Sequence, residues 1–278
     1  MDLSKCIKLI ESDANKISIM ASNKITYSEL VKKYKITVLE KDYNIKINLF
    51  TLDVINTSDL PYKIKSSIFN MIRNSNILKP KFRKERRTFI NFLRLYFSHK
   101  YKEIEFVNRE SPDFKIFKDD KTFSYEIVQA VINPVFEKLL YYNLGKNLNK
   151  KDYEKRIDQY FPSKVNKFFI QKVNNAIVLS PGKGLFNSET IRKQIIKMII
   201  KKIEKYKNFN DKGFEKNIIV FCNNIGFSQK NDFLDIRNKI KNNDKIVNSS
   251  IDKIFVINNL HQILVEYNKN GNFVEHTK

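Results

Sequence analysis

The chain has 278 residues, enough for one large domain or two smaller ones with a buried core. Hydrophobic residues make up 42% of it, which excludes intrinsic disorder as the main state, and its few Gly and Pro residues exclude collagen-like chains. Lys and Arg total 52 against 30 Asp and Glu, giving a formal net charge of +22. This excess predicts a polyanionic partner: nucleic acid first, with an anionic membrane surface or an acidic protein as alternatives.

No signal for export, membrane insertion or a structural metal is found. The two cysteines, Cys6 and Cys222, are far apart and lack zinc-site spacing, so neither a zinc site nor a disulfide framework is expected. The charged start of the chain lacks a signal-type apolar segment, and no apolar run approaches the ~18 residues of a membrane span. We expect a cytoplasmic protein that makes no use of a membrane.

Residues 1–80 carry mixed signals and are interpreted as an accessory region. Thr26 and Glu29 form a capping-box pattern that predicts a short helix to about Lys33. Residues 36–52 are rich in β-branched and aromatic side chains and are typical of strand, and a second helix is expected over about 59–73. The two helices could form a DNA-reading helix-turn-helix pair; a dimerisation or lid role is equally open.

The remaining residues, 81–278, show clearer periodicity. Aromatic and Leu residues at helical spacing predict a buried helix over about 85–99. Three strands are then expected at 103–107, 112–117 and 123–128, the last two joined by a tight turn at 118–121.

A mostly helical insertion is expected at about 133–172. It is followed by a short strand at 176–179, a lysine-rich helix at 188–207, a buried strand at 217–222, a helix at 232–241 and a hairpin at 254–257 and 262–267. This order predicts an α/β (α+β) fold with a mixed central sheet flanked by helices.

Several catalytic classes are excluded by the missing motifs. The three histidines form no zinc or His-based nuclease pattern, and neither a P-loop nor a Gly-x-Ser-x-Gly elbow is present. The remaining candidates for catalysis are carboxylate side chains. Asp113 enters one strand and Glu126 lies on the next, so an antiparallel pair can bring both carboxylates together. Such a pair, with the backbone carbonyl of Ile127, can hold Mg²⁺ for phosphodiester hydrolysis.

The segments Pro112-Asp113 and Glu126-Ile127-Val128 resemble the motif of the PD-(D/E)XK nuclease superfamily. The resemblance covers about residues 85–267 and implies a restriction-endonuclease-like fold, Mg²⁺ or Mn²⁺ as cofactor, and the metal ligands named above. Restriction enzymes of this fold are often dimers, because two active sites must reach two strands, so the resemblance makes a homodimer one expectation and leaves the oligomeric state open.

One departure from the family motif concerns its lysine, whose position is held here by Val128. Lys115, two residues after Asp113, and Lys201 or Lys202 on the following helix are the candidates to replace it. Gln129 follows Val128 and is the remaining catalytic candidate. If none of the lysines reaches the acids, catalysis is weak or absent.

The sequence therefore predicts a Mg²⁺-dependent DNA endonuclease of restriction or phage-defence type. A catalytically inactive nucleic-acid-binding protein of the same fold, or an RNA-directed nuclease, is the alternative. The basic side chains expected to contact the nucleic acid are Lys193, Lys197, Lys201, Lys202, Arg86 and Arg87.

Overall fold

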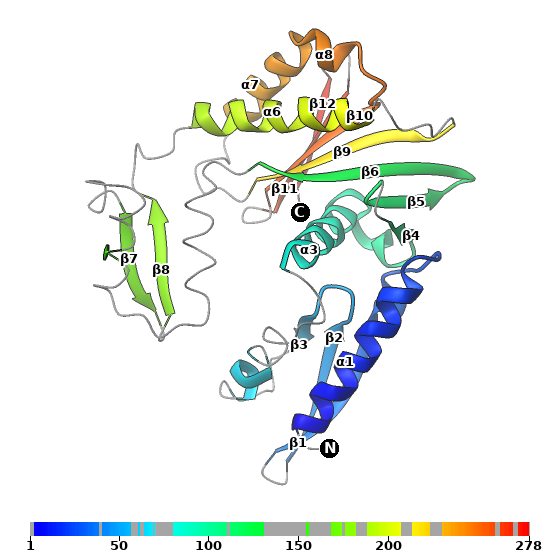
Figure 1. Cartoon of the computed structure of the whole chain (residues 1–278), viewed down its shortest axis with the longest axis vertical. Helices are drawn as coiled ribbons and strands as arrows, with labels where there is room; N and C mark the ends of the chain where they lie inside the picture. The colour runs from blue at the N-terminus through cyan, green and yellow to red at the C-terminus, as the bar shows by residue number, and fades with distance from the viewer. Residues whose placement is uncertain are drawn as a thin grey trace.

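A computed structural model of the chain describes most of its residues (Figure 1). The described residues are 3–38, 41–56, 61, 64–68, 70, 80–109, 112–130, 154–155, 168–173, 176–181, 188–206, 213–222, 230–258, 262–268 and 272–277.

A seven-stranded mixed sheet forms the centre of the fold, in the order β12-β11-β10-β9-β6-β5-β4. Its strands are β4 (Glu105–Asn108), β5 (Phe114–Lys118), β6 (Lys121–Gln129), β9 (Glu215–Phe221), β10 (Lys253–Asn258), β11 (Ile263–Asn268) and β12 (Phe273–Thr277). β9 runs parallel to both β6 and β10, and every other neighbouring pair is antiparallel. Residues 218–221 of β9 are a continuous apolar run and are all buried, because both faces of the strand are covered.

Helices cover the two faces of this sheet (Figure 1). α3 (Pro80–Tyr96) packs on one face; α6 (Ser188–Tyr206), α7 (Lys230–Lys241) and α8 (Asp244–Val247) pack on the other. A hydrophobic cluster lies under each layer. Alternate residues of β6 enter different clusters: Tyr125 and Ile127 join the α3 cluster, and Val128 joins the α6 cluster.

The N-terminal region forms a helix on a small sheet. α1 (Leu3–Met20) lies against the antiparallel strands β1 (Val31–Val38), β2 (Lys41–Asn48) and β3 (Asp53–Asn56). Asp13 of α1 is buried and accepts hydrogen bonds from Lys32 Nζ at 2.7 Å and Tyr34 Oη at 2.9 Å. Burial alone would raise the pKa of Asp13, but these two hydrogen bonds and the charge of Lys32 outweigh it, so the pKa is lowered.

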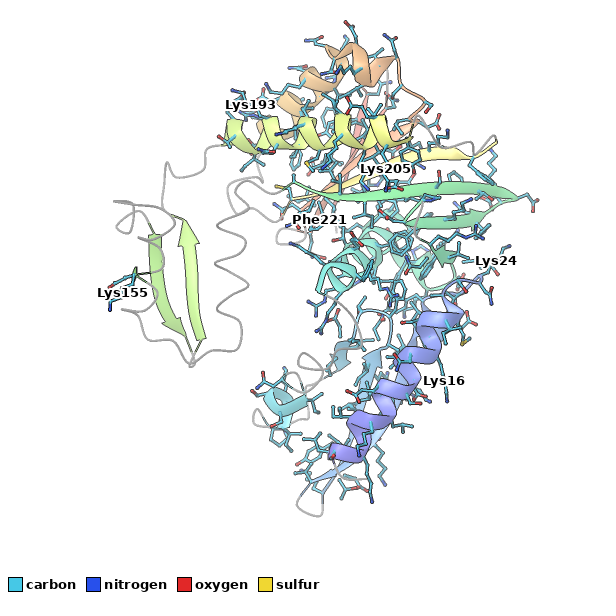
Figure 2. All side chains as sticks on the ribbon, in the orientation of Figure 1. Lys16, Lys24, Lys155, Lys193, Lys205 and Phe221 are labelled. Carbon is cyan, nitrogen blue, oxygen red and sulfur yellow. The ribbon has the colours of Figure 1, made fainter. Side chains whose placement is uncertain are left out.

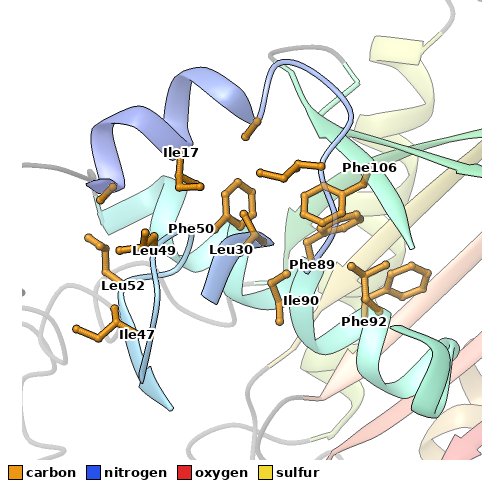
Figure 3. Close-up of a cluster of buried hydrophobic side chains, with 14 of the residues drawn as sticks. Ile17, Leu30, Ile47, Leu49, Phe50, Leu52, Phe89, Ile90, Phe92 and Phe106 are labelled. Carbon is orange, nitrogen blue, oxygen red and sulfur yellow. The ribbon is translucent and has the colours of Figure 1, made fainter. Parts of the chain in front are cut away.

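One hydrophobic cluster continues from this N-terminal layer into the layer of α3 (Figure 3). Phe50, after β2, packs edge-to-face on Phe106 of β4, with ring centroids 5.7 Å apart. Phe89 of α3 stacks on Phe114 at 3.9 Å. Ile25 also pairs with Phe106 as an isolated antiparallel bridge. The predicted boundary near residue 80 is therefore crossed by a continuous core.

The expected mixed sheet and most of its elements are confirmed. The turn between β5 and β6 is tight because Asp119 and Asp120 both adopt positive φ, of 49° and 58°, which suits a two-residue hairpin. The lysine-rich helix, the buried strand and the C-terminal hairpin all form where they were expected.

Two expectations about secondary structure are wrong. The Thr26–Glu29 hydrogen bonds form, but only a 3₁₀ turn follows at Ser28–Leu30, because β-branched Val31 already belongs to β1. The helix-turn-helix pair is therefore absent, although residues 64–68 are helical. Most of the predicted helical insertion, residues 133–153 and 156–167, lies outside the described residues. Of the rest, residues 154–155 are helical, and the last five residues belong to strand β7 (Phe168–Val173), which pairs with β8 (Ala176–Pro181).

Neither α1 nor β12 was expected from the sequence. In the part of the chain that the structure describes, no helix has the length and hydropathy needed to cross a bilayer.

Candidate active site

Asp113 is held just before β5 by its own backbone. Its carbonyl accepts hydrogen bonds from Asn108 Nδ2 at 2.9 Å and from the Arg109 amide at 3.0 Å. Its carboxylate Oδ2 accepts the amide N–H of Ile127 at 2.7 Å. Phe114 and Tyr125 are the last residues that pair β5 with β6. The Asp113 side chain therefore lies beside the part of β6 that continues beyond this pairing.

Glu126 projects from the middle of β6 toward α6, because its neighbours Tyr125 and Ile127 face α3. Its side chain is only 3% exposed. A buried carboxylate of this kind is costly unless a cation or hydrogen-bond donors accompany it.

That cation is Lys202 of α6. Its Nζ forms an ion pair with Glu126 Oε2 and lies 3.7 Å from Asp113 Oδ2. Lys205, one turn further along α6, reaches Glu126 at 3.9 Å and is 59% exposed. The crossover helix therefore supplies two ammonium groups to two carboxylates that come from neighbouring strands.

The ionisation of Asp113 depends on its surroundings, Glu126 included. Burial, and after it the negative charge of Glu126, raise the pKa of Asp113 to about 6 against the opposing effect of Lys202. Glu85 of α3 adds a smaller contribution in the raising direction. A buried acid whose pKa is raised by a neighbouring carboxylate is typical of a functional site and favours one that receives a cation.

The donors present fit Mg²⁺ or Mn²⁺. Within the described residues, no group of three or more His, Cys, Asp or Glu side chains could hold a metal ion. Mg²⁺, however, is commonly bound by one or two carboxylates, with water and substrate phosphates completing the shell. The Ile127 amide points to Asp113, and the amide and carbonyl of a strand residue point to the same neighbour. The Ile127 carbonyl is thus directed to the Asp113 side.

The other predicted catalytic residues are placed differently. Lys115 is buried on the face of the sheet that carries Glu126, and its Nζ lies 4.3 Å above the ring of Phe214. Gln129 lies two residues after Ile127 and four after Tyr125, so it is on the same face of β6 as these residues, the face that α3 covers. Of the candidate lysines, the structure brings Lys202 to the acids and leaves Lys201 exposed to solvent.

The two predicted arginines dock α3 on the N-terminal layer. Arg86 Nη1 donates to the Phe50 carbonyl at 3.3 Å, and its guanidinium lies 4.3 Å above the Phe50 ring. Burial lowers the pKa of Arg86 to about 10. Arg87 Nε donates to Asp53 Oδ2 at 2.8 Å. Arg86 is therefore engaged within the protein and is not part of the surface expected to contact nucleic acid.

Lys205 is a site residue that sequence reasoning assigned to the lysine face of the helix and did not place beside the acids. It continues the four-residue spacing of the lysines on α6, and this spacing is the signal that could have included it.

Comparison of the chain with known protein families, curated protein sequences and solved structures gave no match.

Proposed function

We propose that the protein is a metal-dependent nuclease that hydrolyses DNA phosphodiester bonds. The convergence of Asp113, Glu126 and Lys202 carries this proposal. An acid from each of two neighbouring strands and a lysine from the crossover helix meet in one place, in a chain of net charge +22. A polyanionic substrate and a buried acidic pair are both accounted for by phosphodiester hydrolysis.

Each residue has a role in the proposed reaction. Asp113 and Glu126, with the Ile127 carbonyl, would hold Mg²⁺ or Mn²⁺, which supplies Lewis acidity and a water of lowered pKa. The Lys202 ammonium would stabilise the negative charge that builds on the phosphate in the transition state. The Ile127 amide keeps the Asp113 carboxylate oriented, so little rearrangement of this acid is needed when substrate arrives.

The order of elements around the site supports a restriction-endonuclease-like arrangement. A helix, an antiparallel meander carrying both acids, a crossover helix and a parallel strand follow each other along the chain as α3, β4-β5-β6, α6 and β9. Val128 fills the lysine position of that family's motif and packs in the α6 cluster. Lys202 of α6, the helix that covers Val128, supplies the positive charge that the family's lysine would provide.

A second candidate function is a nucleic-acid-binding protein of the same fold that does not cleave. The observation that favours it is the ion pair of Lys202 with both acids, which already neutralises charge where a metal would bind. This alternative predicts salt-sensitive binding of DNA without any product in Mg²⁺ or Mn²⁺.

The test is incubation of the purified protein with supercoiled plasmid in Mg²⁺, in Mn²⁺ and in EDTA, with RNA as a second substrate. We expect nicked or linear DNA in the presence of either metal and none in EDTA. Asp113→Asn and Glu126→Gln should each abolish the product.

Asp119→Asn is the matched control, because Asp119 lies in the β5–β6 turn with its side chain 81% exposed. It should cleave like the wild type. Cleavage in EDTA, or cleavage that survives both site substitutions, contradicts the proposal. Binding without cleavage under all conditions favours the second candidate, and cleavage of RNA alone makes the enzyme a ribonuclease.

A further inference from the structure

A stripe of four lysines runs along the exposed side of α6: Lys193, Lys197, Lys201 and Lys205. Each lies four residues from the next, which is about 6 Å along a helix axis, so the stripe spans about 18 Å. Lys193 lies near the start of α6, whereas Lys205 lies further along the helix and nearer β6 (Figure 2). The stripe therefore begins at the candidate site and leads away from it.

The ammonium groups of this stripe are poorly compensated within the protein. In the part of the chain that the structure describes, Lys197 and Lys201 form no ion pair. Lys193 is 72% exposed, and its one ion pair among the described residues is a 3.7 Å contact with Glu189. Like charges four residues apart on a helix repel each other, so the stripe costs stability in the free protein.

Basic side chains at the contact between α6 and α7, in contrast, form ion pairs. Arg192 lies 3.0 Å from Asp232 and 2.9 Å from Asp235 of α7. Lys239 of α7 lies 3.3 Å from Glu189. Charges at the contact between the two helices are paired, whereas the outward stripe is left for an external anion.

We propose that the stripe binds consecutive phosphates of one DNA strand on a single side of the scissile phosphate, so that the footprint of the enzyme is asymmetric. The inference rests on the proposed function, because the acids mark where the scissile phosphate lies. Lys205 is 3.9 Å from Glu126 and is the end of the stripe at the site. The spacing of about 6 Å between successive lysines is comparable with the separation of neighbouring phosphates along a strand.

The first test is equilibrium binding of fluorescently labelled DNA in EDTA, followed by anisotropy over a series of NaCl concentrations. Each phosphate contact contributes about 0.9 to the slope of log affinity against log salt for duplex DNA and about 0.7 for a single strand. We expect the combined Lys197→Gln and Lys201→Gln variant to lower the slope by about 1.8 on duplex or about 1.4 on single-stranded DNA. Measuring both DNAs shows whether the stripe binds duplex or single-stranded DNA.

Lys8→Gln is the control, because Lys8 is an exposed lysine on α1, outside the stripe. It removes one positive charge, as each of the two stripe substitutions does, and should leave the slope unchanged. An unchanged slope in the double variant, or an equal loss in Lys8→Gln, overturns the inference.

The second test concerns asymmetry and uses cleavable DNA shortened from one side of the cut or from the other. We expect shortening on one side alone to slow the wild type, and the Lys197→Gln, Lys201→Gln variant to be insensitive to it. Equal sensitivity on the two sides contradicts an asymmetric footprint. If DNA is bound with the predicted slope change but is never cut, the proposed nuclease function is refuted, whereas phosphate binding by the stripe is supported. If DNA is cut but the slope is unchanged in the double variant, only phosphate binding by the stripe is refuted.

Discussion

Replacing Lys202 by Met should destabilise the protein and stop cleavage. The substitution keeps the length of the side chain and removes the charge that lies between Glu126 and Asp113. Breaking a buried ion pair from one side costs about 3–5 kcal/mol, mainly because the remaining charge is left unpaired. Lys202 is 16% exposed and Lys205 lies 3.9 Å from Glu126, so we expect the lower end, about 3 kcal/mol.

The assay is urea unfolding followed by circular dichroism, with cleavage measured on the same preparations. Lys201→Met is the matched control, since Lys201 is the preceding residue and is exposed; it should change the free energy of unfolding by less than about 0.5 kcal/mol. Adding Glu126→Gln to Lys202→Met should recover a large part of the lost stability, because no buried charge then remains unpaired at that position. Equal stability of the two lysine variants, or no recovery in the double variant, refutes this reasoning.

The remaining predictions concern the N-terminal layer. Arg86→Ala should lower the free energy of unfolding by about 3 kcal/mol, because the hydrogen bond to the Phe50 carbonyl and the contact with the Phe50 ring are lost. Arg87→Ala removes a more exposed ion pair and should lower it by less than about 1 kcal/mol. Similar losses for the two variants in urea unfolding would contradict this assignment. Asp13, whose folded-state pKa is lowered, contributes stability above its unfolded pKa and loses it as pH falls through the folded value. Urea midpoints between about pH 5 and pH 3 should therefore fall more steeply in the wild type than in Asp13→Asn, and parallel curves would show that the Lys32 contact adds nothing.

The meander and the helices around it are predictable because their signals are local. A tight turn between two strand-like segments sets the register of β5 and β6, so Asp113 and Glu126 could be placed on neighbouring strands before the structure was known. The crossover helix shows its buried face as isoleucines at four-residue spacing. These features do not depend on distant parts of the chain.

The identity of the lysine at the site depends on tertiary packing. Lys201 and Lys202 are adjacent, and only the orientation of α6 on the sheet decides which one meets the acids. Lys202 follows Ile199 by three residues and precedes Ile203, so it borders the buried face, whereas Lys201 points outward. This angular argument could have selected Lys202, but the distance to Glu126 could not be obtained from it.

The N-terminal layer shows the opposite situation. Val31 continues into a strand because β1 and β2 bury Tyr34, Ile36 and Ile45 under α1, and this packing outweighs the local helix signal at Thr26. The use of Arg86 in docking α3 was equally hidden, since a basic residue at the start of a helix carries no mark of what it will contact.

The most direct measurement of the central claim is calorimetric titration of Mn²⁺ into the protein, comparing the wild type with Glu126→Gln and with the exposed control Asp119→Asn. We expect Mn²⁺ to bind to the wild type and to Asp119→Asn, whose substituted side chain is exposed, and not to Glu126→Gln, because the proposed site needs both acids. Equal Mn²⁺ binding by all three proteins, or none by the wild type even with DNA present, would contradict the claim that these two acids form a metal site.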